Sequence, residues 1–221
     1  MRLSFILRKA MLLFGHWGIT LGTAALSACA SDRFRKTNPN PTRNSTINTG
    51  VVSGWFTSVL GATEACFETL GRKVDIRAIF LGSLLPDIID KPIGNGLLAS
   101  SLNNGRIFAH SLLFLFIVLM AGLLVYRRYR NSFFLVVAFG VMIHSILDSM
   151  WVDPHSLFWP FLGVAFAKGG PDNFFVMIFQ SAHKPSYFVV EIVGFVIVCA
   201  FGLWLVRKKQ VTRFLRTGTV N

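Results

Sequence analysis

Five stretches of this chain are apolar over almost the length that a helix needs to cross a lipid bilayer. They cover about residues 10–30, 51–70, 107–126, 132–151 and 187–206. About 20 apolar residues cross a bilayer core, and only a helix or a closed barrel satisfies all backbone groups there. Only 14% of the residues are charged, whereas a soluble domain carries about 25%. We therefore expect a single all-α integral membrane domain over residues 1–221, multi-pass in the cell or inner membrane, with about five transmembrane helices.

The segments between these stretches predict shorter features. Residues 31–50 are rich in Asn, Thr, Pro and Arg, which is typical of a flexible polar loop. Residues 76–85 are apolar but too short to span, and we expect Pro86 to end any helix there. Residues 151–170 contain prolines and glycines, so we expect a short interfacial or re-entrant segment. Residues 207–221 form a basic tail.

Basic residues give the chain a net charge of +12, and they cluster beside the apolar stretches. The clusters are Arg33, Arg35, Lys36 and Arg43; Arg127, Arg128 and Arg130; and Arg207, Lys208, Lys209, Arg213 and Arg216. This distribution is typical of the positive-inside bias and of contact with anionic membrane lipids, and not of a nucleic-acid surface. With the turn at 127–130 in the cytoplasm, the favoured topology has an outer N-terminus and an inner C-terminus.

The N-terminal residues also fit a second interpretation. Arg2, Arg8 and Lys9, an apolar run and then Leu26-Ser27-Ala28-Cys29 look like a lipoprotein signal that is cleaved before Cys29. However, His16 interrupts the apolar core of such a signal. Cleavage would also remove a residue that the rest of the chain needs. We therefore favour a retained helix.

Ionisable residues recur at the edges of the apolar stretches. They are His16, Asp87, Asp90, His110, His144 and Asp148. A charged group at bilayer depth costs at least about 2.5–3.5 kcal/mol, so it needs a partner or a function. Imidazoles and carboxylates are ligands for zinc and similar divalent ions. With an outer N-terminus all six residues can meet at one face of the bilayer, and we expect a metal site there.

Each part of this pattern has a structural alternative. His144 and Asp148 are four residues apart on one helix face, where they can share an ion or form a hydrogen-bonded pair between helices. Asp87 and Asp90 repel each other unless a cation or a proton lies between them, or they act as helix N-caps. Arg106 can bind a phosphate or carboxylate with two nitrogens, or extend to a lipid headgroup.

The same residues carry a resemblance to a known family. Gly15-His16, Leu85-Pro86-Asp87-Ile88-Ile89-Asp90, Gly105-Arg106, His110-Ser111, His144, Leu147-Asp148 and Trp159-Pro160 follow one another in order. Together they resemble the membrane-bound metal-dependent hydrolase family, which contains the LexA-regulated inner-membrane hydrolase-like proteins. Many members read His-Arg-Gly-x-Thr-His before a membrane helix, whereas here Gly105 replaces the first His and Ala109 the Thr. The resemblance implies a helical membrane protein with a divalent-metal centre, with the six residues as ligands or their neighbours.

The resulting hypothesis is a membrane-bound metal-dependent hydrolase. A divalent ion, which we expect to be zinc, activates water near the membrane surface. One of Asp87, Asp90 and Asp148 is then a ligand and another the general base, while Arg106 neutralises the substrate. A lipid or another phosphoester is the substrate that this location favours. The alternative is a non-catalytic membrane protein that uses the His/Asp cluster for a structural metal or for ion transport, although a transporter needs polar groups along the depth of its helices.

Overall fold

The computed structural model describes residues 13–37, 54–166, 168 and 185–220, and all regular elements among them are helices. The expectation of an all-α chain is confirmed for these residues. The longer helices are α2 (Leu13–Thr37), α3 (Gly54–Lys73), α4 (Ile76–Lys91), α5 (Leu112–Tyr129), α6 (Phe133–Leu147) and α9 (Pro185–Arg207). The shorter ones are the π-type turn η1 (Pro92–Leu97), η2 (Met150–Val152), α7 (Pro154–Leu157) and α10 (Val211–Thr217), which lies in the basic tail.

Two of the described helices are long and apolar enough to cross a membrane, which is fewer than the five expected. They cover Leu112–Tyr129 in α5 and Phe188–Arg207 in α9. Only 6% of α5 is buried, so its apolar surface faces outward as it does in a helix surrounded by lipid. The helix α6 is apolar but has 15 residues, and α2 and α3 carry charged residues near their C-terminal ends.

Several element boundaries differ from the expected ones. The helix α2 runs to Thr37 and therefore includes the first residues of the expected polar loop, because the chain has no proline before Pro39; residues 38–53 lie outside the described part. The expected helix over 107–126 begins only at Leu112, because the Ser111 hydroxyl accepts the Phe114 N–H at 3.1 Å and caps α5. The chain before Ser111 is thus free to fold as a loop.

The helix α4 does not end at Pro86 but continues to Lys91. Proline has no N–H to donate to the carbonyl four residues earlier, which belongs to Gly82. The next carbonyl, that of Ser83, accepts a hydrogen bond from the His144 ring at 2.7 Å. Packing of α4 against α6 therefore supports the helix where proline weakens it.

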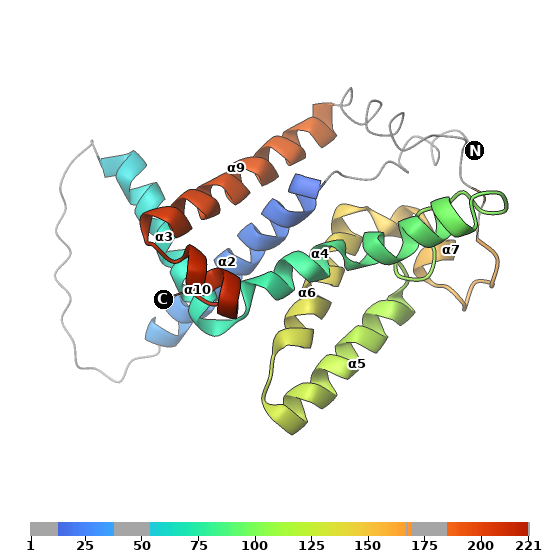
Figure 1. The fold of residues 1–221 in the computed structure, drawn as a ribbon, viewed down its shortest axis with the longest axis horizontal. Coiled ribbons are helices and arrows are strands. Elements are labelled where there is room, and N and C mark those ends of the chain that lie inside the picture. Colours follow the sequence, from blue (N-terminus) through green and yellow to red (C-terminus); the bar gives the residue numbers. More distant parts are fainter. Residues whose placement is uncertain (1–12, 38–53, 167, 169–184, 221) are drawn as a thin grey trace.

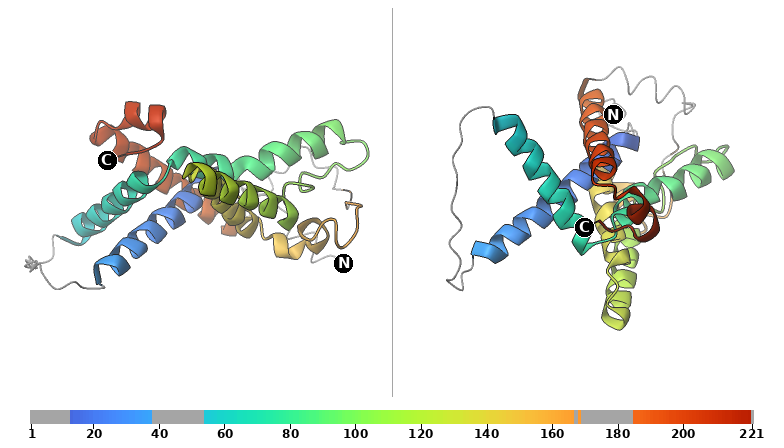
Figure 2. Two further views of the ribbon diagram at one scale, coloured as in Figure 1. Left: turned by 90° about the horizontal axis from the view of Figure 1, so that it is seen from below. Right: turned by 60° about the vertical axis from the view of Figure 1, so that its left-hand side comes forward.

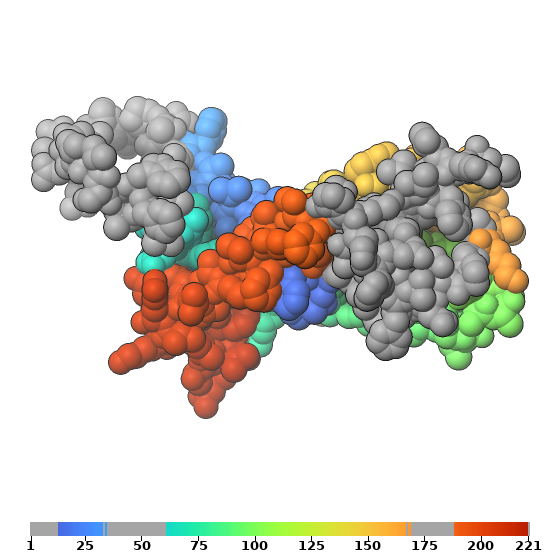
Figure 3. Space-filling view, turned by 90° about the horizontal axis from the view of Figure 1, so that it is seen from above, coloured from blue at the N-terminus to red at the C-terminus, as the bar shows by residue number. Residues whose placement is uncertain are grey.

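The helix α4 lies at the centre of the arrangement, between α6 and α2 (Figure 1). The helices α5 and α6 form an antiparallel hairpin, and α9 and α3 pack on α2 (Figures 1 and 2). The space-filling view shows the side chains of α9, in orange, lying against the blue ones of α2 (Figure 3). Ionisable residues on α2, α4 and α6 are thereby brought to one region.

Glycines set how closely these helices approach. A Cβ on Gly140 of α6 would lie 2.7 Å from the Gly82 carbonyl carbon of α4, and one on Gly82 would lie 2.3 Å from the Val137 oxygen. A Cβ on Gly18 of α2 would lie 2.0 Å from the Gly194 oxygen of α9. Small residues of this kind let helix backbones touch in membrane proteins. His144, one turn beyond Gly140, is consequently held against α4.

We expect Gly140→Ala to destabilise the protein by about 1–3 kcal/mol, because the added methyl group forces α4 and α6 apart. The matched control is Gly202→Ala in α9, where a Cβ would meet nothing within 4 Å. Alanine favours a helix over glycine, so the control should be as stable as the wild type or more so. Thermal unfolding in detergent measures both variants, and equal melting temperatures for the two would contradict the proposed close crossing.

Candidate metal centre

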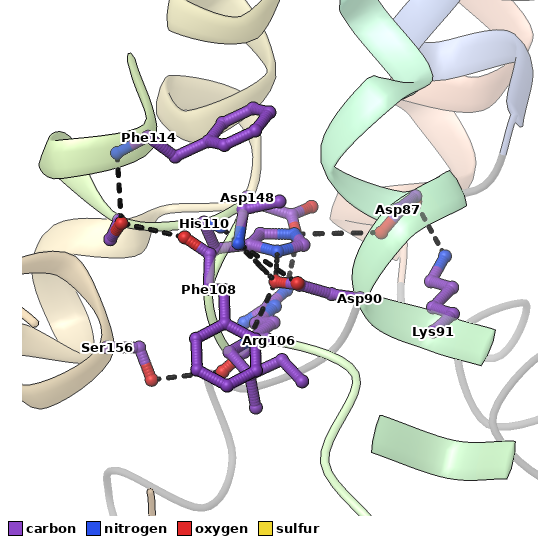
Figure 4. Close-up of polar contacts among 12 residues, drawn as sticks. Asp87, Asp90, Lys91, Arg106, Phe108, His110, Phe114, Asp148 and Ser156 are labelled. Atoms are coloured by element: carbon purple, nitrogen blue, oxygen red, sulfur yellow. Dashed lines mark hydrogen bonds and ion pairs between the residues drawn. The ribbon is translucent and has the colours of Figure 1, made fainter. Parts of the chain in front are cut away.

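The structure brings the six predicted residues together where α2, α4, α6 and the segment before α5 meet. Figure 4 shows Asp87, Asp90, His110 and Asp148 among them. His16 comes from α2, Asp87 and Asp90 from the last two turns of α4, His110 from the segment before α5, and His144 and Asp148 from the end of α6. All except Asp87 are buried. Because both aspartates of α4 lie near its C-terminal end, the alternative that they are N-caps is wrong.

The hydrogen bonds of two histidines determine which of their nitrogens carries the proton. The Nδ1 atom of His110 lies 2.7 Å from Asp90 Oδ2, and that of His144 lies 2.7 Å from the Ser83 carbonyl oxygen. A carboxylate and a carbonyl oxygen only accept, so Nδ1 donates in both rings. In a neutral imidazole the other nitrogen, Nε2, then carries a free lone pair.

These two lone pairs point toward each other. The Nε2 atoms of His110 and His144 are 3.2 Å apart, and both side chains are fully buried. Two acceptors at this distance repel unless a cation lies between them, either a metal ion or a proton on one ring. The pair therefore defines a cation position at the end of α6.

Two carboxylates complete a set of four side chains that can each offer one donor atom to a metal ion at this position. Asp87 Oδ1 lies 3.6 Å from His110 Nε2 and 4.0 Å from His144 Nε2, and Asp148 Oδ2 lies 3.7 Å from His110 Nε2. The four donor atoms all lie within 4.8 Å of one another. A tetrahedral ion with ligands at about 2.0–2.1 Å places their atoms roughly 3.3–3.4 Å apart. Small side-chain shifts would thus fit these residues to a divalent ion.

Asp90 has a supporting position, outside the group of four donors. Its carboxylate accepts the N–H groups of Ile107, Ala109 and His110 at 2.8–3.2 Å in addition to the His110 ring. A carboxylate behind a ligating histidine fixes the ring and raises its basicity. The closing of the loop onto Asp90 is what aims His110 at the other donors.

His16 borders the four donors without belonging to them. Its ring stacks on that of His144 with centroids 4.3 Å apart, and its Nε2 lies 3.3 Å from Asp148 Oδ1. The preceding residue, Gly15, donates its N–H to Glu191 Oε2 of α9 at 3.1 Å. Packing of α9 on α2 therefore holds His16 at the level of the centre.

Two basic side chains pair with the two carboxylates of the group of four. Lys91 Nζ lies 2.6 Å from Asp87 Oδ2, and Arg106 Nη2 lies 2.9 Å from Asp148 Oδ2. The Arg106 side chain is 11% exposed and directed toward Asp148. Sequence reasoning assigned no role to Lys91, although its spacing of four residues from Asp87 was a usable signal. The Ser83 carbonyl gave no such signal because it is a backbone group.

The electrostatics favour positive charge at this position. Burial alone would raise the pKa of Asp87, but the hydrogen bond from His110 and the charge of Lys91 outweigh it and lower the pKa below its usual value. Burial would lower the pKa of His110, but Asp87 and Asp90 outweigh it and raise the pKa. The Asp87 carboxylate is thus charged at neutral pH and attracts a cation.

These observations define a helical membrane protein with a buried cluster of histidines and aspartates that fits a metal ion. The chain belongs to the YdjM inner membrane protein family, whose model matches residues 11–211. No curated protein and no solved structure matches it. The match covers all six predicted residues and identifies a membrane protein, while the family description contains no reaction.

We expect Asp90→Asn to weaken metal binding by about 10–100-fold, because an amide cannot accept all of these N–H groups and no longer fixes the His110 ring. The matched control is Glu68→Gln on α3, an exposed acid that pairs with Arg72. Competition with a chelator of known affinity measures the loss. Unchanged affinity in Asp90→Asn would show that Asp90 does not support the site.

Proposed function

We propose that this protein is a membrane-bound metal-dependent hydrolase. The observation that carries the proposal is the pair of Nε2 lone pairs, 3.2 Å apart in a buried position and flanked by Asp87 and Asp148. Two imidazoles and two carboxylates suit a borderline ion better than calcium or magnesium, which prefer oxygen alone. Zinc is therefore the metal that we propose.

A divalent ion held by His110, His144 and Asp148 would supply Lewis-acid activation of a water molecule near neutral pH. The protein contributes the rest. Asp90 and the Ser83 carbonyl orient the two rings. Asp87 is the carboxylate that keeps some contact with the surroundings, at 12% side-chain exposure, so it is our candidate for the general base. Asp90 is excluded from that role because its oxygens are already engaged by four N–H groups.

The proposal includes a multi-pass topology with five membrane helices. The helices α5 and α9 meet the length and apolarity of a span. Support for the others is their packing: α2 has 25 residues and lies along α9, α3 packs on α2, and α6 forms a hairpin with α5. Membrane lipids are the expected surroundings, and a substrate with an ester or phosphoester bond at the membrane surface suits this location.

One observation favours the non-catalytic alternative. The raised pKa of His110 means that a proton shared between His110 and His144 also relieves the contact of their lone pairs. A cluster that holds only a proton or a structural ion is consistent with ion transport or with bracing of the helices. The two functions differ in metal content and in turnover.

We expect the wild type, purified in detergent without chelator, to contain a stoichiometric divalent metal. His110→Ala and His144→Ala should lose it, whereas His155→Ala should keep it because His155 is exposed on α7. Elemental analysis measures the metal, and hydrolysis of acyl esters and phosphoesters in mixed micelles measures activity. Wild-type protein without metal would overturn the proposal. Stoichiometric metal without turnover of either bond would favour the structural alternative.

A further inference from the structure

Two fixed positive charges border the proposed metal position on its accessible side. The side chains of His110, His144, Asp90 and Asp148 are at most 1% exposed. Asp87, Arg106 and Lys91 retain 12%, 11% and 28% exposure. Among the described residues of the centre, the side where a ligand can approach is therefore the side with the two cations.

Arg106 is held in place independently of its charge. Its backbone N–H donates to Asn104 Oδ1 at 3.0 Å, and its backbone carbonyl oxygen accepts the Ser156 hydroxyl at 3.1 Å. The guanidinium approaches Asp148 through one nitrogen, Nη2 (Figure 4). A guanidinium carries five N–H donors in a planar fork that matches the oxygens of a phosphate or carboxylate. Arg106 thus has donors beyond the one aimed at Asp148.

The charges of the centre also favour an anion. Three carboxylates, those of Asp87, Asp90 and Asp148, are matched by the two cations Lys91 and Arg106. A divalent ion consequently leaves the centre with a net positive charge. A neutral acyl ester makes no use of that charge, whereas a phosphate group does, and its oxygens accept hydrogen bonds from ammonium and guanidinium groups.

We propose that the ligand of this centre is an anionic phosphate group, bound at the metal position between Lys91 and Arg106. The proposal rests on the proposed function and selects phosphoesters over neutral acyl esters as its substrates. Ile88 follows Asp87 and Phe108 lies two residues after Arg106, and both are exposed. These apolar side chains are positioned to contact acyl chains, so the phosphate group can belong to a lipid or to a soluble ester.

Binding of inorganic phosphate to metal-loaded protein tests this proposal without measuring turnover. We expect calorimetry to detect phosphate binding to the wild type, and Lys91→Gln and Arg106→Gln to weaken it about tenfold or more at unchanged metal content. Arg106→Lys should lie between, because it keeps the charge and loses the fork. The control is Lys208→Gln, a remote basic residue paired with Glu64, which should bind as the wild type does.

The outcomes separate this proposal from the hydrolase proposal. Metal-loaded wild type that does not bind phosphate, or Lys91→Gln with wild-type phosphate affinity, would overturn the phosphate ligand while the metal centre stands. If Arg106→Gln loses its metal, Lys91→Gln decides alone. Protein without metal would overturn both proposals. Glycerol phosphate and dihexanoyl phosphatidic acid below its micelle concentration then distinguish the sources: at least tenfold tighter binding of the lipid assigns a lipid headgroup, and equal binding assigns a soluble ester.

Discussion

The hydrogen bonds to the Asp90 carboxylate are the interaction on which the rest of the centre depends. A buried carboxylate is costly unless it is paired and hydrogen-bonded. Asp90 meets this requirement by accepting three backbone N–H groups and the His110 ring from the segment that precedes α5. This segment and α4 therefore fold as one unit. Because Nδ1 of His110 is used in this contact, Nε2 is left to face His144, Asp87 and Asp148. The same hydrogen bond therefore closes the loop and orients the ring.

The second histidine is aimed by helix packing. The backbones of α4 and α6 approach closely at Gly82 and Gly140, and His144 lies one turn further along α6. Its Nδ1 there meets the Ser83 carbonyl, close to the proline that interrupts the hydrogen-bond pattern of α4. A feature that weakens a helix in isolation thus lies beside a carbonyl group that orients the His144 ring. The metal proposal requires both rings to present Nε2, and each ring does so through a different part of the structure.

Basic side chains pair with the carboxylates of the cluster. Lys91 and Arg106 each contact one of the two donor carboxylates, and His16 contacts the second oxygen of Asp148. His16 depends in turn on α9, which reaches α2 through Glu191 and the close contact of Gly18 with Gly194. The outer helices therefore influence the centre without contributing donors to it. The cluster therefore joins charged groups from α2, α4 and α6 and is more than a single ion pair between two helices.

Much of this protein follows from its sequence. The apolar stretches and the low charge determine a helical membrane protein, and the cost of ionisable groups at bilayer depth singles out His16, Asp87, Asp90, His110, His144 and Asp148 as residues that need partners. Their separate roles do not follow from spacing. Whether Asp90 can ligate a metal or instead orients His110 depends on a loop that folds back on it. The continuation of α4 beyond Pro86 depends on packing against α6. Sequence determined which residues form the buried cluster, because residue type and local hydropathy are local properties. Only the tertiary structure decided which nitrogen and oxygen atoms face one another, because hydrogen bonds between segments far apart in the chain set those directions.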